Sequence, residues 1–137
     1  MIKDKDLVGM RSLEKRLKSF KKWPFDNEMG NNKEKMAEAG FYFIGSKREP
    51  DLVRCFMCLK ELDGWEEEDV PWQEHEKHAP YCQFVQLNKP ESEITFLELH
   101  QLEMHQVINV TNKLLAKKIE EFKKQCQKTR ETLETLE

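Results

Sequence analysis

The spacing of three cysteines and one histidine constrains this chain more than any other feature. Cys55 and Cys58 are separated by two residues, His75 follows after sixteen more, and Cys82 after a further six. Two cysteines at the first spacing can hold one metal ion from a tight turn. The histidine and the last cysteine complete a tetrahedral set of three thiolates and one imidazole, so the pattern predicts a structural zinc site.

Two catalytic uses of these residues are disfavoured. A redox Cys-x-x-Cys pair is typical of a βαβ unit, and no such pattern surrounds this one. A catalytic zinc keeps one position open for water, whereas four protein ligands would fill the site. The metalloprotease and deaminase motifs are both lacking. We therefore expect a structural metal and no enzymatic activity.

The composition limits the size of the core. Of the 137 residues, 38% are apolar and 36% are charged, and the mean hydropathy is −0.82. A chain this polar buries a modest core and benefits from a metal staple. No run approaches the roughly 18 apolar residues of a membrane span, and the charged first ten residues do not resemble a secretory signal. We expect a protein of the cytoplasm and nucleus, with reduced cysteines.

Local patterns divide the chain into four expected segments: an N-terminal segment 1–11, a zinc domain 12–87, a linker 88–94 and a long helix 95–137. Within the zinc domain we expect helices at 12–22, 33–39 and 71–78, strands at 41–44 and 52–56, and a turn or third short strand at 61–64. The first helix should end at Trp23-Pro24, because proline disfavours helical geometry in the residue before it. Gly40 is suited to end the second helix.

The C-terminal segment has the pattern of one long helix. Thr95 and Glu98 form the signature of a capping box, and neither proline nor glycine follows them. About 40 helical residues extend roughly 60 Å, so we expect the helix to project. A coiled-coil seam of apolar or small residues begins at Leu115 and includes Leu115, Ile119, Phe122, Cys126, Leu133 and Leu136. The helix either folds back on its own domain or offers this seam to partner helices.

The residues around the cysteines resemble the BIR domain, the baculoviral inhibitor-of-apoptosis repeat. The resemblance is carried by Arg16, Phe20, Trp23-Pro24, residues 36–41 and 51–58, Leu62, Trp65, Pro71-Trp72, Glu74-His75 and Cys82. One such domain followed by a long helix is similar to the single-BIR branch of the family. The resemblance implies an α+β fold, with a three-stranded antiparallel sheet and short helices around one structural zinc ion.

The resemblance also implies a function in cell division. Proteins of this branch belong to the chromosomal passenger complex with Aurora B kinase, and their long helix forms a three-helix bundle with INCENP and borealin. Their BIR binds the N-terminal tail of a phosphorylated histone, and the family is linked to blocking apoptosis. The expected locations during division are the centromere, the spindle and the midbody.

A peptide slot is implied by residues that match the family. Asp69 and Glu74 would accept hydrogen bonds from the ammonium group of a free peptide N-terminus. Leu62 and Trp65 would wall a small pocket for a first alanine side chain. The same slot would also take the N-terminal alanine of peptides that antagonise inhibitor-of-apoptosis proteins.

Three further residues extend the implied slot. Asp63 stands where the family more often has glutamate, at the contact with the second peptide residue. Lys60 and His78 match the basic pair near the phosphothreonine. A histidine binds phosphate better when it is protonated, and the nearby acids favour protonation.

The resemblance predicts that the free chain is a homodimer. The expected contact residues are Leu7, Val8, Phe96 and Leu99, which are apolar residues in otherwise charged segments. One familiar site of the branch is lacking, because Asn32-Lys33 stands where relatives have a Thr-Pro phosphorylation site, and no serine or threonine in this chain precedes a proline.

Other functions remain as alternatives. Direct caspase inhibition is the main one, although caspase-inhibiting relatives use flanking segments or several BIR domains. A nucleic-acid-binding finger is disfavoured, because residues 61–76 hold eight acidic residues and no lysine or arginine. The basic stretch 113–130 could still touch DNA weakly. A ubiquitin ligase would need a RING domain with about eight zinc ligands.

Overall fold

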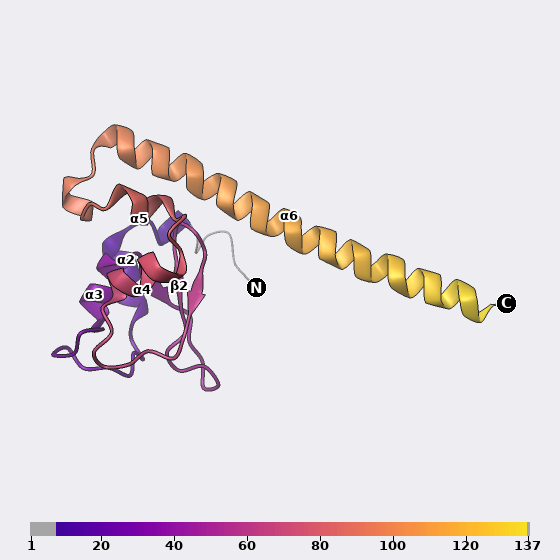
Figure 1. Ribbon diagram of the computed structural model, residues 1–137, viewed down its shortest axis with the longest axis horizontal. Helices are drawn as coiled ribbons and strands as arrows, with labels where there is room; N and C mark the ends of the chain where they lie inside the picture. Colours follow the sequence, from indigo (N-terminus) through magenta and orange to yellow (C-terminus); the bar gives the residue numbers. More distant parts are fainter. Residues whose placement is uncertain (1–7, 137) are drawn as a thin grey trace.

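The computed structural model describes residues 8–136 and shows a small α+β domain from which one long helix projects (Figure 1). The elements, in chain order, are α2 (Leu13–Ser19), α3 (Lys33–Glu38), β1 (Phe41–Phe43), β2 (Val53–Cys55), β3 (Glu61–Leu62), α4 (Pro71–His78), α5 (Gln83–Leu87), the 3-10 helix η1 (Glu91–Glu93) and α6 (Phe96–Thr135). No helix in this part of the chain is long and apolar enough to cross a membrane.

The three strands form one antiparallel sheet in the order β1-β2-β3, which confirms the expected sheet. Phe41 pairs with Cys55 between the first two strands, and Val53 pairs with Leu62 between the second and third. The turn between β2 and β3 contains Leu59 in the left-handed region, at a φ of 63°. A backbone hydrogen bond of 2.9 Å from the amide of Cys55 to the carbonyl of Lys60 closes this turn.

The first helix is shorter than expected. It ends at Ser19, well before Pro24, because Phe20 leaves the helical region at a ψ of 39°. The hydroxyl of Ser19 accepts a hydrogen bond of 2.8 Å from the amide of Phe43 in β1. The end of α2 is therefore determined by its contact with the sheet rather than by the proline. The second helix ends as expected, with Gly40 at a φ of 95° directly after its cap.

A buried arginine joins the helical layer to the core. Arg16 is 2% exposed, and its guanidinium donates to the carbonyl oxygens of Ala37, Met10 and Arg11 at 2.8–2.9 Å. Its Cζ lies 4.6 Å from the ring centroid of Phe56. Burial lowers the pKa of Arg16 to about 10, so the side chain remains charged at neutral pH and holds α2 against α3.

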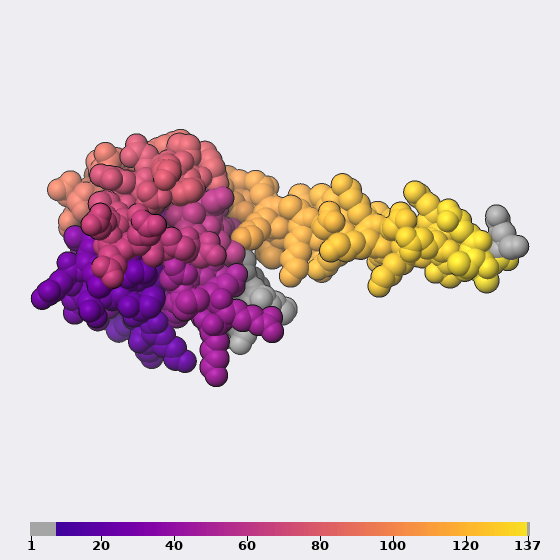
Figure 2. Space-filling model, turned by 60° about the horizontal axis from the view of Figure 1, so that its bottom comes forward, coloured from indigo at the N-terminus to yellow at the C-terminus, as the bar shows by residue number. Residues whose placement is uncertain are grey.

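The start of the long helix folds back on the zinc domain, which is one of the two arrangements expected from the sequence. The helix starts with the expected capping box of Thr95 and Glu98. Leu102 and Gln106 are buried against the zinc domain, and the Gln106 amide donates to the carbonyl of Phe56 at 3.0 Å. Beyond this docked part, the side chains of α6 are exposed and the helix projects (Figure 2). The start of α6 thus packs on its own domain, and the rest is free for other contacts.

Candidate metal centre and peptide-binding surface

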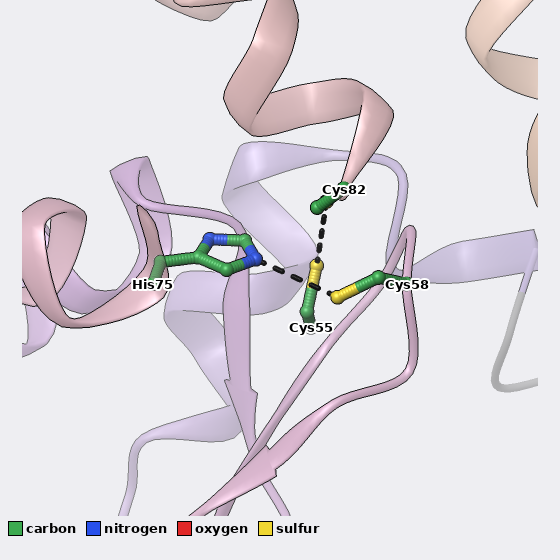
Figure 3. Close-up of side chains that lie close together, drawn as sticks. All are labelled: Cys55, Cys58, His75 and Cys82. Carbon is green, nitrogen blue, oxygen red and sulfur yellow. Dashed lines mark hydrogen bonds between the residues drawn. The ribbon is translucent and has the colours of Figure 1, made fainter. Parts of the chain in front are cut away.

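The four metal-ligand residues come together from four different places. Cys55 ends β2, Cys58 lies in the turn that follows, His75 lies in α4, and Cys82 directly precedes α5. Their side chains point toward one another, and all four ligand atoms lie within 4.8 Å of one another (Figure 3). The Cys55 and Cys82 sulfurs are 3.9 Å apart, and the Cys58 sulfur lies 3.6 Å from Nε2 of His75. The sequence prediction of the cluster is confirmed.

The surroundings of the cluster orient its ligands. Nδ1 of His75 lies 2.7 Å from the carbonyl oxygen of Ala39, so this nitrogen carries the proton and Nε2 offers its lone pair to the centre of the cluster. The amide of Met57 donates to the Cys55 sulfur at 3.3 Å. His75, Cys55 and Cys82 are fully buried, and Cys58 is partly exposed.

Three thiols this close together cannot all ionise without a cation. Burial, together with hydrogen bonds from the neighbouring thiols, raises the pKa of Cys55 far above its usual value. The hydrogen bond with Cys55 lowers the pKa of Cys58, but Cys82 and burial outweigh it and raise the pKa to about 12. Hydrogen bonds from Cys55 and Cys58 lower the pKa of Cys82. The donor set therefore fits a divalent, thiolate-preferring metal whose positive charge replaces the thiol protons.

The acidic loop between β3 and α4 is tied to the segment before α3. The amide of Gly30 donates to the carbonyl of Glu67 at 3.0 Å, and the Asn31 side chain donates to the carbonyl of Glu66 at 2.8 Å. A Cβ atom on Gly30 would lie 3.0 Å from the carbonyl oxygen of Asp69. The two hydrogen bonds hold the acidic loop against the segment before α3, and the close approach at Gly30 leaves no room for a side chain there.

The slot residues lie along β3, this loop and α4. Trp65 is 8% exposed and packs edge-on against Phe41, with ring centroids 5.7 Å apart. Leu62 is half-buried and Asp63 is exposed. A carboxylate oxygen of Asp69 accepts from the amide of Glu66 at 2.8 Å. Trp65 is therefore mostly a core residue, and little of it is open to a ligand.

The two residues matched to the phosphothreonine contact have different neighbours. Nε2 of His78 lies 3.2 Å from a Glu74 carboxylate oxygen, which also pairs with Lys77 at 3.4 Å. Lys60 instead lines an open groove together with Tyr81 and with Lys113 of α6. Lys60 therefore lines the same groove as a side chain of the long helix.

The expected protein-contact residues are exposed where the structure describes them. Val8 and Phe96 are 61% and 87% exposed, and Leu99 is 41% exposed, whereas Leu7 lies outside the described residues. The seam residues Leu115, Ile119, Phe122, Cys126, Leu133 and Leu136 are all exposed. These surfaces are free in the single chain.

The sequence prediction missed the polar contacts that dock α6. The side-chain amide of Asn109 donates to the carbonyl of Met57 at 2.9 Å and to Oε1 of Gln83 at 3.1 Å. The guanidinium of Arg11 donates to Gln106 and forms an ion pair of 3.7 Å with Glu103. An apolar pattern cannot reveal such residues; the only signal was the spacing of Leu102, Gln106 and Asn109 by four and three.

Comparison with known proteins gives consistent matches. The model of the BIR family, described as the inhibitor of apoptosis domain, matches residues 16–86. Baculoviral IAP repeat-containing protein 5 of Mus musculus is 40% identical over 121 residues, which cover 88% of this chain and 86% of the mouse protein. The protein of the same name from Cavia porcellus is 41% identical over 123 residues, which cover 90% and 87% of the two chains. Baculoviral IAP repeat-containing protein 5.2-B of Xenopus laevis is 40% identical over 126 residues, which cover 92% and 80%.

Proposed function

This chain belongs to the inhibitor-of-apoptosis family, as a single-BIR protein of the survivin type, and we propose that it is a non-enzymatic adaptor. Its BIR domain would bind the N-terminus of a phosphorylated histone tail. Its long helix would bundle with INCENP and borealin and so bring Aurora B kinase to the centromere, and later to the spindle and midbody. These roles rest on the family resemblance together with the surfaces described above.

The metal in this proposal is one structural zinc ion per chain. Cys55, Cys58, His75 and Cys82 would hold it, because their ligand atoms already face one centre and are largely buried. The ion would link the β2–β3 turn to α4 and to the start of α5. It supplies cohesion rather than chemistry, since four protein ligands leave no position for a substrate.

The observation that carries the peptide-binding role is the position of β3. Within residues 8–136, β3 pairs only with β2, so its outer edge has free backbone groups. An extended peptide can add to such an edge as a further strand. The tethered acidic loop follows this strand and leads into α4, which carries Glu74, so the positive N-terminus of the peptide would meet carboxylates there. The same slot would take N-terminal alanine peptides that antagonise the family.

Acetylating the peptide N-terminus should weaken binding at least tenfold. The acetyl group removes the ammonium charge, which leaves Asp69 and Glu74 without their partner, and each charge-assisted hydrogen bond contributes about 1.5–3 kcal/mol. Calorimetry with a peptide that begins with alanine, in free and acetylated forms, measures the difference. A peptide with its free N-terminus and a C-terminal amide serves as the control. Equal affinities for the free and acetylated peptides would reject the slot.

The free chain should form a homodimer through its exposed apolar residues. Val8, Phe96 and Leu99 lie in charged surroundings and gain burial when two copies pair. Light scattering at micromolar concentration should give about twice the chain mass. Phe96→Glu should shift the protein to the monomer, whereas Gln101→Glu, at an exposed position on the same helix, should not. A monomeric wild-type protein contradicts this prediction.

A further inference from the structure

An open groove of about 440 Å³ lies where α6 crosses the zinc domain. Its walls come from the β2–β3 turn, from the segment before Cys82 and from α6. The lining residues are Cys58, Leu59, Lys60, Glu61, Tyr81, Asn109 and Lys113. The groove thus brings Lys60, the residue matched to phosphothreonine binding, close to Lys113 of α6, which lies about fifty residues further along the chain.

The groove is basic, although the neighbouring part of the domain is acidic. Lys60 and Lys113 both line it, and its one carboxylate, Glu61, accepts a hydrogen bond of 3.0 Å from Arg54. The groove therefore holds two lysines and one carboxylate, and Arg54 outside the lining already pairs that carboxylate. The phenol of Tyr81 is exposed at the rim and can donate a hydrogen bond. Two lysines and a phenol form a site suited to a phosphate group.

The position of Lys113 is fixed by the docking of α6. Asn109, one helical turn earlier, is bonded to the carbonyl of Met57 and to Gln83, and Gln106 is bonded to the carbonyl of Phe56. These bonds hold Lys113 over the groove. Lys113 is exposed at the groove; desolvation by the nearby domain and the charge of Arg54 lower its pKa, and Glu61 and Cys58 raise it by less. The carboxylate that acts on Lys113, Glu61, is already paired with Arg54, so an anion in the groove would add a counter-charge.

We propose that Lys113 of the long helix, with Tyr81, completes the phosphate subsite that Lys60 begins, so that α6 helps to bind the phosphorylated residue of the peptide. This inference rests on the proposed function and refines it. It assigns phosphate recognition to a groove between the two parts of the molecule rather than to the BIR domain alone. A shift of the start of α6 would then change peptide affinity.

The test uses the full-length zinc-bound protein and two peptides that begin with a free alanine, one phosphorylated at the third residue and one unmodified. Lys113→Gln should weaken binding of the phosphorylated peptide about five- to tenfold, since one charge-assisted contact is lost. Binding of the unmodified peptide should be unchanged. Lys113→Arg should retain most of the phosphate preference. Lys117→Gln is the matched control, because it removes the same charge one turn further along α6 and does not line the groove; it should change neither affinity by more than about twofold.

The test distinguishes a failure of the role of α6 from a failure of the proposed histone recognition. If the wild-type protein prefers the phosphorylated peptide and Lys113→Gln keeps that preference, the role of α6 is overturned while the proposed function stands. An equal loss for both peptides, or an equal effect of Lys117→Gln, also overturns it, because the lysine would then act through stability or general charge. If the wild-type protein shows no phosphate preference, the proposed histone recognition fails and this inference fails with it.

Discussion

Cys82→Ala should unfold the BIR domain, whereas Cys126→Ala should leave it intact. Losing a ligand removes metal-binding energy that is also folding energy, roughly 10 kcal/mol or more in small zinc modules. The net free energy of unfolding of a domain is about 5–15 kcal/mol, so a loss of this size removes most or all of it. Cys82 is fully buried in the ligand cluster, and Cys126 is exposed far along α6. The two variants make the same chemical change at a metal ligand and at a surface cysteine.

The fluorescence of the three tryptophans measures whether the zinc domain is folded. Trp23, Trp65 and Trp72 all lie in the zinc domain, and none lies in α6. Cys82→Ala, or chelation of the wild-type protein, should shift the emission to that of exposed tryptophan and should abolish a cooperative thermal transition. Elemental analysis should give one zinc per chain for the wild type and for Cys126→Ala. A folded, metal-free wild-type protein, or a folded Cys82→Ala protein, would contradict the structural-zinc assignment.

The sequence predicted those parts of the site that depend on local pattern. The spacing of Cys55, Cys58, His75 and Cys82 is imposed by the tetrahedral geometry of a metal, so it could be recognised without a structure. The α4 helix matched its expected bounds because Pro71 is suited to the first helical turn. The capping box at Thr95 and Glu98 likewise involves only neighbouring residues. In each case, the determining interactions are short in sequence or are imposed by metal chemistry.

The parts that could not be predicted depend on contacts between distant segments. The end of α2 is set by a hydrogen bond between Ser19 and Phe43. The five-residue α5 helix is too short to show a helical period. The docking of α6 rests on the amides of Gln106 and Asn109, which bond to backbone carbonyls of the β2–β3 turn. A polar residue in a charged helix normally faces solvent, so its residue type gives no sign of such a partner.

The structure also shows that α6 has two distinct faces. Leu102, Gln106, Asn109 and Lys113 contact the zinc domain or line its groove. Leu115 lies two residues after Lys113, which is about 200° around a helix with 3.6 residues per turn. The seam therefore begins on the face opposite to the docked one. Partner helices can occupy it without displacing the contacts that place Lys113 over the groove.

If INCENP and borealin bind the seam as proposed, Leu115→Glu/Phe122→Glu should lose both partners yet keep zinc and peptide binding. Both side chains are exposed in the single chain, at 56% and 66%, so the substitutions cost the free protein little. In a helical bundle, each glutamate would be buried without a partner, at roughly 3 kcal/mol or more. The combined effect should exceed a hundredfold in affinity. Co-purification with the partner helices measures it.

The matched control is Lys117→Gln/Lys124→Gln. It changes the net charge by the same two units, on positions about 200° around the helix from the two seam residues, and should co-purify normally. Normal co-purification of the glutamate variant would show that the seam is not the docking surface. Loss of peptide binding in that variant would show that the two faces are coupled through the helix itself. Because the docked face and the seam lie on opposite sides, we expect the variant to retain both its zinc and its preference for the phosphorylated peptide.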